Sequence, residues 1–201
     1  MVFGVNQVFP ATNKYPVRPS QERIFMEGDQ LGLLQVYTGD GKGKTTAALG
    51  LALRAWGRGL KVCMIQFMKK GEDYGEILAL RRMEGVDLYQ FGSDRLITKT
   101  SVHPEDVDLA HRALAFAEGA LMSGEYDVII LDEINVALFF GLISPAEALS
   151  VLKKRRKDVE VILTGRNAPT EILEEADLVT RMIAEKHPYD KGVMARAGIE
   201  F

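Results

Sequence analysis

The stretch "GDGKGKTT", residues 39–46, restricts the fold of this chain more than any other feature of its 201 residues. An apolar run, "LLQVYT", precedes it, and an alanine-rich run, "AALGLALRA", follows it. A glycine-rich turn between a strand and a helix presents backbone N–H groups at the helix N-terminus, where anions bind. The sequence therefore predicts a phosphate-binding loop in an α/β protein.

The loop departs from the common phosphate-loop pattern at one position. In G-x-x-x-x-G-K-[ST], a glycine is expected five residues before Gly43, but the chain has Thr38 there and its nearest glycine is Gly39. Lys44 adds a point charge, and Thr45 offers a hydroxyl to Mg²⁺. The alternative is an exposed glycine-rich turn with incidental lysines. The strand–helix context favours phosphate binding, while the missing glycine weakens the case for ordinary chemistry at the γ-phosphate.

After the loop, apolar runs typical of buried strands alternate with helical patterns. We expect strands over residues 33–38, 60–67, 86–91, 126–133, 160–165 and 177–183. We expect helices over residues 43–57, 75–83, 105–124 and 168–176, and a capping box at "SPAE", residues 144–147. Continuous apolar strands alternating with helices predict a single-domain α/β fold. Its sheet is mostly parallel with helices on both faces, as in P-loop NTPases of the RecA-like type.

Composition limits the partners and the compartment. The net charge of −3 gives no global basic excess, so we expect no nucleic-acid partner. Cys63 is the only cysteine, which excludes an intramolecular disulfide and favours the cytoplasm. No run approaches the roughly 20 apolar residues of a membrane span. Residues 1–30 carry three prolines without periodicity and are expected to form an N-terminal arm, with a short helix over 20–28, ahead of a domain over 31–201.

A second motif, "VIILDE", places Asp132 and Glu133 at the end of the most apolar strand. Such a strand end resembles a Walker B element, which holds Mg²⁺ directly or through water. Alone, a solvated strand end is about equally plausible. Together with the loop, the motif favours a metal–nucleotide site. Glu133 keeps a second interpretation, because a glutamate here orients water in many hydrolytic ATPases.

Basic residues follow other predicted strands. Arg166 follows the strand over 160–165, where it could clamp a phosphate or stack on a base. Arg54, on the helix after the loop, could pair with a carboxylate or face a ligand. Lys69 and Lys70 follow the second strand and could belong to the site or to a solvated loop. The chain shows no serine or cysteine nucleophile motif.

The ordered set "TGDGKGKTTAALGLALRA", "QFMK", "ILDEIN", "LTGR" and "KHPYDKGVMARAGIEF" resembles the P-loop ATP:corrinoid adenosyltransferases. The likeness covers about residues 30–201. The short loop, with Gly39 and no glycine at 38, is the form that this family uses. The resemblance implies that a reduced cobalt(I) corrinoid attacks C5′ of ATP and that the whole triphosphate leaves. It also implies a homodimer, an electron donor such as a flavoprotein, and a place in adenosylcobalamin biosynthesis or salvage.

The resemblance also assigns roles to residues. It implies catalytic roles for Lys44 and Glu133, and Mg²⁺ (or Mn²⁺) held by Thr45, Glu133 and Asp132. Its nucleotide-binding set is Gly39, Asp40, Gly41, Lys42, Gly43, Lys44, Thr45, Thr46, Arg54 and Arg166. The arm over residues 1–30 is implied to help cover the site.

One loop departs from the family. Several members carry a Phe-x-Trp pair after the third strand, which is linked to displacing the lower axial ligand of cobalt. Here that loop reads "GSDRLITKT". Either another group excludes the ligand, or the substrate is an intermediate without it, such as a cobyrinic acid diamide. The rival interpretations are a RecA-like Mg-dependent ATPase, which would release ADP and phosphate, and a non-catalytic nucleotide-binding regulator.

Overall fold

The computed structural model describes residues 31–95, 97–98 and 101–200. Within these residues, six strands form one sheet in the order β3-β2-β4-β5-β1-β6, and neighbouring strands pair in parallel throughout. The strands are β1 Leu34–Thr38, β2 Val62–Phe67, β3 Val86–Phe91, β4 Val128–Asp132, β5 Glu160–Thr164 and β6 Leu178–Arg181. The prediction of a mostly parallel sheet is confirmed.

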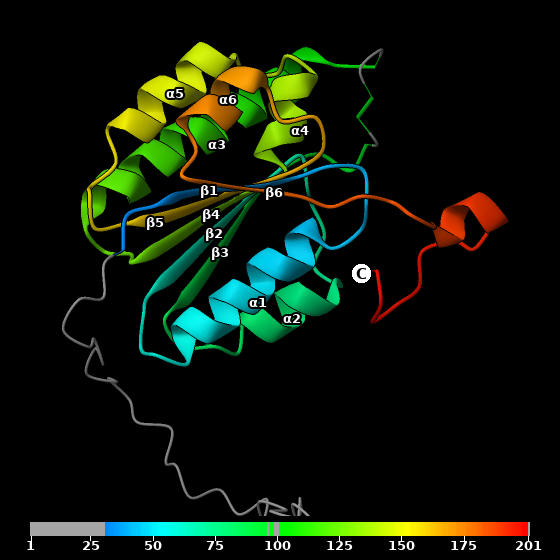
Figure 1. Cartoon of the computed structure of the whole chain (residues 1–201), viewed down its shortest axis with the longest axis horizontal. Coiled ribbons are helices and arrows are strands. Elements are labelled where there is room, and N and C mark those ends of the chain that lie inside the picture. The colour runs from blue at the N-terminus through cyan, green and yellow to red at the C-terminus, as the bar shows by residue number, and fades with distance from the viewer. Residues whose placement is uncertain (1–30, 96, 99–100, 201) are drawn as a thin grey trace, which may run out of the picture.

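Helices cover both faces of this sheet, as predicted. Figure 1 shows α1 and α2 on one face and α3, α4, α5 and α6 on the other. The helices are α1 Lys44–Trp56, α2 Gly75–Leu80, α3 Pro104–Ser123, α4 Ile134–Phe139, α5 Pro145–Lys153 and α6 Thr170–Glu175, with a 3₁₀ turn η1 at Pro188–Lys191. The predicted arm over 1–30 and its short helix lie outside the described residues.

The two faces take alternate side chains of the central strands, because successive residues of a strand point in opposite directions. In β2, Cys63 and Ile65 belong to the apolar cluster that contains α3, α4 and α5. Val62 and Met64 belong to the cluster against α1. Every residue of β2 is buried, which explains its continuous apolar run. β6, at the sheet edge, has four exposed residues.

Most element predictions are confirmed, with two differences. The capping box forms at α5, where the Ser144 backbone N–H donates to a carboxylate oxygen of Glu147 over 2.8 Å. The helix expected over 75–83 ends at Leu80. The helix α4 was not predicted, because its six residues follow directly on the apolar strand and extend the apolar run. The strand ends at Asp132 because Glu133 adopts a left-handed backbone conformation, with φ of 62°.

The parallel arrangement gathers the candidate residues at one edge. The carboxyl ends of parallel strands share an edge, and ligands of open α/β sheets bind there. The segments that follow β1, β2, β4 and β5 contain the loop, Lys69, Glu133 and Arg166. The residues after β6 continue along the same edge into the C-terminal tail, residues 184–200 (Figure 1). No helix among the described residues is long and apolar enough to span a membrane.

Candidate active site

The glycines of the loop allow two backbone segments to touch. Gly39 has φ of 97° and Gly43 has φ of 116°, values that side chains disfavour. The Gly41 N–H donates to the carbonyl oxygen of Met182 over 2.8 Å. A Cβ on Gly41 would lie 2.7 Å from the carbonyl oxygen of Ile183. The residues after β6 therefore support the loop from one side, and only glycine fits between them.

This contact explains why position 38 carries threonine. Thr38 is the last residue of β1, and it pairs with Arg181 of β6. Its hydroxyl accepts the Ala168 N–H over 3.3 Å, and its side chain is buried. The close approach comes one residue later, where a Cβ on Gly39 would lie 2.4 Å from the carbonyl oxygen of Met182. Glycine is therefore required at position 39, where the backbones approach, and not at position 38.

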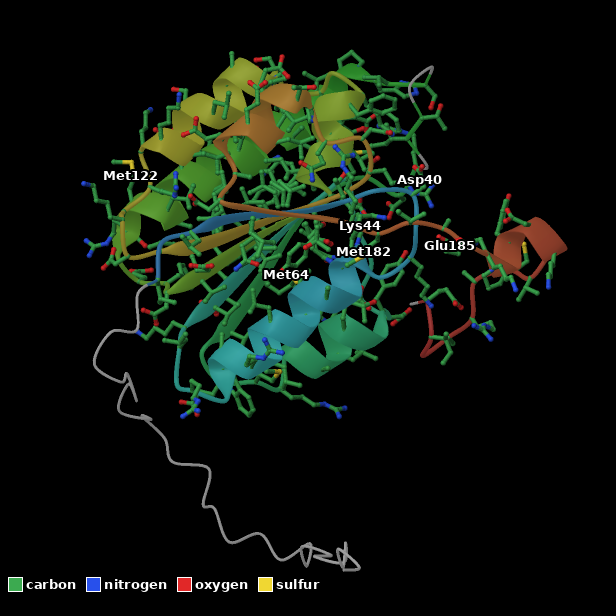
Figure 2. All side chains as sticks on the ribbon, in the orientation of Figure 1. Asp40, Lys44, Met64, Met122, Met182 and Glu185 are labelled. Atoms are coloured by element: carbon green, nitrogen blue, oxygen red, sulfur yellow. The ribbon has the colours of Figure 1, made fainter. Side chains whose placement is uncertain are left out.

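Lys44 folds back over the loop. Its Nζ donates to the carbonyl oxygens of Gly39 and Gly41, at 2.7 Å each. Burial lowers the pKa of Lys44, Arg166 lowers it further, and Glu133 and Asp40 oppose the shift. Figure 2 shows Lys44 at the start of α1 beside the loop that carries Asp40. The ammonium is thus held where a ligand on the loop meets it.

Asp132 is the centre of a buried polar cluster. Its Oδ1 accepts from the hydroxyls of Thr45, at 2.8 Å, and Thr164, at 2.7 Å. Its Oδ2 accepts from Gln66 Nε2, at 3.1 Å, and Lys69 Nζ, at 2.7 Å. Burial alone raises the pKa of Asp132, but the Lys69 ammonium and these hydrogen bonds outweigh it and hold the pKa below its usual value. The cluster fixes the loop threonine to the end of β4.

Three members of this cluster were not among the predicted site residues. Lys69 was considered and left open, and the structure pairs it with Asp132. Gln66 and Thr164 were missed. Both are fully buried polar residues at the ends of apolar strands. That exception to the strand pattern is the signal that could have identified them.

Glu133 lies beside this cluster and faces a cavity. Its backbone N–H donates to Thr164 Oγ1 over 3.0 Å, which anchors its left-handed turn. Burial raises the pKa of its carboxyl, the nearby Asp132 raises it further, and Lys69, Lys44 and Arg166 oppose the shift. The charge of this carboxyl is therefore favoured by three cations and disfavoured by burial and by one neighbouring carboxylate.

The cavity has a volume of about 510 Å³, within the usual range for small-molecule sites. It joins the loop, the Lys69 segment, Glu133 and Arg166 to the C-terminal tail. The residues that line it and carry the argument are Gly41, Lys42, Gly43, Lys44, Thr45, Thr46, Lys69, Glu76, Glu133, Arg166, Ile199 and Glu200. Its tail wall was not predicted.

Not every predicted nucleotide-binding residue meets in this cavity. Asp40 lines a neighbouring cavity of about 470 Å³, which shares Arg166 and His187 with the first. Arg54 is exposed near the far end of α1 and does not line either cavity. At 1.5 Å per residue, it lies roughly 15 Å along the helix from Lys44. Its assignment to the nucleotide remains a prediction.

The parallel sheet, the glycine loop at the start of α1 and the carboxylates at the end of β4 define a P-loop nucleotide-binding protein. The solved structure of the flagellar accessory protein FlaH from Methanocaldococcus jannaschii shares this fold. Its TM-score is 0.51 at 15% sequence identity, over 76% of this chain and 71% of that chain.

Sequence comparison identifies the family within this class. The family model for the ATP:corrinoid adenosyltransferases BtuR/CobO/CobP matches residues 30–201, and the chain belongs to this family. It is 36% identical to a corrinoid adenosyltransferase of Sinorhizobium sp, over 92% of this chain and 87% of that protein. It is 33% identical to the Pseudomonas aeruginosa enzyme of the same name, over 90% and 89% of the two chains. The corresponding Escherichia coli K12 protein is 34% identical, over 89% and 90%.

Proposed function

We propose that this protein transfers the 5′-deoxyadenosyl group of ATP to the cobalt(I) of a corrinoid and releases triphosphate. Membership in the adenosyltransferase family supports the reaction. The observation that carries it in the structure is the cavity, which is rich in N–H and ammonium donors but contains no serine or cysteine among its lining residues. Such a site suits a reaction whose nucleophile arrives with the second substrate.

In this reaction the cobalt(I) electron pair forms the cobalt–carbon bond, and the C5′–O bond breaks. The bonding electrons leave with the triphosphate, so negative charge grows on the leaving group. Fixed donors aimed at that charge lower the barrier. The loop N–H groups and Lys44, already gathered around the helix N-terminus, are the groups of this chain that stabilise the leaving triphosphate.

We further propose that Thr45 and Glu133 hold Mg²⁺, or Mn²⁺, with Asp132 behind them. The described residues contain no cluster of three or more His, Cys, Asp or Glu side chains suited to a metal. Mg²⁺ needs none, since it is bound by one or two carboxylates together with substrate phosphates and water. Both oxygens of Asp132 already accept hydrogen bonds, so Glu133 is the better direct ligand. When bound, the ion neutralises charge on the triphosphate.

The substrate and setting follow from the same proposal. A corrinoid without a bound lower ligand suits this chain, because the loop "GSDRLITKT" lacks the Phe-x-Trp pair. A faster reaction with cobyrinic acid diamide than with complete cobalamin, at equal cobalt(I) concentration, would support this preference. Equal or slower reaction would exclude it. A homodimer in the cytoplasm, served by a flavoprotein reductant, completes the proposal.

The test of the reaction is anaerobic and follows the corrinoid. Wild-type protein with Mg-ATP should consume the cobalt(I) absorbance and give a photolabile product. Lys44→Ala should slow this by about 10²- to 10³-fold, because one fixed electrostatic contact to the leaving group is lost. Lys70→Ala is the matched control, since Lys70 pairs with the exposed Asp94 at 2.7 Å and does not line the cavity. An unchanged rate in Lys44→Ala would remove Lys44 from catalysis.

A further inference from the structure

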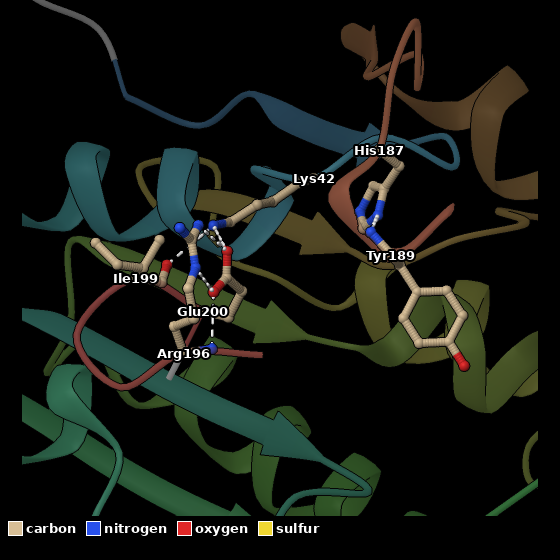
Figure 3. Close-up of polar contacts among 6 residues, drawn as sticks. All are labelled: Lys42, His187, Tyr189, Arg196, Ile199 and Glu200. Carbon is tan, nitrogen blue, oxygen red and sulfur yellow. Dashed lines mark hydrogen bonds and ion pairs between the residues drawn. The ribbon is translucent and has the colours of Figure 1, made fainter. Parts of the chain in front are cut away.

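The C-terminal tail, residues 184–200, closes one side of the cavity through a single loop residue. Lys42 Nζ donates to Glu200 Oε1 over 2.7 Å and to the carbonyl oxygen of Ile199 over 3.0 Å. Figure 3 shows the Lys42 side chain extending from the loop to meet these two groups. Gly198, Ile199 and Glu200 all line the cavity beside the phosphate loop. The carboxylate of Glu200, in the tail, therefore forms an ion pair with Lys42 of the loop.

The carboxylate is organised by the tail itself. Arg196 donates to Glu200 from its backbone N–H, at 2.8 Å, and from Nε and Nη2, at 3.1 Å each (Figure 3). The Ile199 and Glu200 N–H groups both donate to the Arg196 carbonyl oxygen. The last described residues thus form one small turn that presents a carboxylate, already paired with a guanidinium, to Lys42.

The attachment of this turn to the rest of the protein is slight. Both hydrogen bonds described between residues 184–200 and the remainder of the described chain are made by Lys42. The apolar side chains of the tail contribute little burial, since Met194 is 70% exposed and Ile199 is 58% exposed. An exposed ion pair is weak and easily exchanged for another partner. A phosphate group is such a partner, because it offers a lysine the same kind of charged oxygen acceptor.

We propose that Glu200 pairs with Lys42 where a phosphate group would otherwise bind, and that triphosphate and the tail compete for this lysine. Occupation of the loop by a triphosphate releases the tail turn from Lys42, and departure of the triphosphate lets it return. The inference rests on the proposed release of triphosphate. It adds that the tail is displaced while triphosphate is bound and returns when triphosphate leaves. Arg196 travels with Glu200, so its guanidinium keeps the displaced carboxylate paired.

Competition of this kind is reciprocal. If docking of the tail weakens triphosphate binding by some factor, triphosphate must weaken docking of the tail by the same factor. Glu200→Gln keeps the shape of the side chain and removes its charge. It should tighten the binding of inorganic triphosphate about two- to fivefold, the range expected for loss of an exposed ion pair. Glu185→Gln removes a charge from the same tail outside both cavities, and should leave the affinity unchanged.

The experiment combines calorimetry with limited proteolysis of the full chain. Inorganic triphosphate is titrated into wild type, Glu200→Gln and Glu185→Gln. Trypsin cleavage after Lys191 and Arg196 is followed by mass spectrometry with and without triphosphate. We expect triphosphate to speed cleavage of the wild-type tail, and Glu200→Gln to be cleaved fast in its absence.

Equal affinity of Glu200→Gln and wild type, or protection of the tail by triphosphate, would overturn the competition while leaving the proposed reaction intact. Failure of wild type to bind triphosphate at all would count against both. The two failures are therefore distinguishable from one set of titrations.

Discussion

Two carboxylate–lysine pairs flank the phosphate loop, and they have the same length. Lys69 Nζ lies 2.7 Å from Asp132 Oδ2, and Lys42 Nζ lies 2.7 Å from Glu200 Oε1. The Asp132 side chain is fully buried, whereas the Glu200 side chain is 22% exposed and that of Lys42 is 43% exposed. Asp132 has four donors, which come from the ends of two strands, β2 and β5, and from the start of α1. Glu200 is held by its own tail and one loop residue.

The difference shows that distance alone does not assign a role to an ion pair. A buried carboxylate that loses its partners is left as an uncompensated polar group, so the Asp132 pair acts as a fixed part of the frame. An exposed pair costs little to break, so the Glu200 pair is suited to exchange with a ligand. The site combines a rigid wall, where the buried Asp132 fixes Thr45, with a replaceable wall, where Glu200 of the tail pairs with Lys42.

Asp132→Ala should produce the largest effect on folding. It leaves the donors of Thr45, Thr164 and Gln66 inside the protein without their acceptor, and the expected loss in free energy of unfolding is about 3–5 kcal/mol. Urea denaturation measures it. Asp94→Ala, which breaks an exposed pair of equal length with Lys70, is the control and should leave the midpoint unchanged. Equal midpoints for both variants would contradict the structural role of Asp132.

Glu133→Gln should show that metal binding depends on Glu133 and not on Asp132. Since the oxygens of Asp132 are engaged, the Mg²⁺ requirement should depend on Glu133, and the Mg²⁺ concentration for half-maximal nucleotide binding should rise about 10- to 100-fold. Glu76→Gln, another carboxylate that lines the cavity, should leave it unchanged. A wild-type metal response in Glu133→Gln would take Glu133 out of the metal site.

Lys69→Met should weaken the pH dependence of stability that Asp132 contributes. In wild type the pKa of Asp132 lies below its unfolded value, so this contribution is present above about pH 4 and is lost as pH falls. Without the ammonium, only the remaining hydrogen bonds oppose the effect of burial, so the pKa of Asp132 should rise and its contribution to stability should shrink. We expect a loss of about 1–3 kcal/mol at neutral pH. Urea midpoints from about pH 2 to 8 give the slope, and a wild-type slope would mean that Lys69 does not hold this carboxylate.

The sequence predicted the rigid wall better than the replaceable one. Parallel strands end at one edge, so a glycine loop after one strand and Asp132-Glu133 after another must come close, and the buried Thr45–Asp132 hydrogen bond is the result. The partnership of Lys69 with that carboxylate depended on which strands are neighbours, and the strand order was not part of the prediction. Short-range patterns predict elements and their ends, but not their order in the sheet.

No sequence pattern predicted the replaceable wall. The contact between Lys42 and Glu200 joins residues 158 positions apart, and no periodic pattern leads to it. Its residues are exposed, so burial does not constrain their sequence as it does in a strand. The helix α4 was missed for the opposite reason, because an uninterrupted apolar run hides the turn at Glu133 where the strand ends.

The central claim is that the loop holds a triphosphate as a leaving group, and the phosphate product tests it most directly. Phosphorus NMR of an anaerobic mixture of protein, Mg-ATP and cobalt(I) corrinoid should show inorganic triphosphate in equal amount to the cobalt(I) consumed. ADP and phosphate, with the corrinoid unchanged, would contradict the account and assign Glu133 to a hydrolytic water instead.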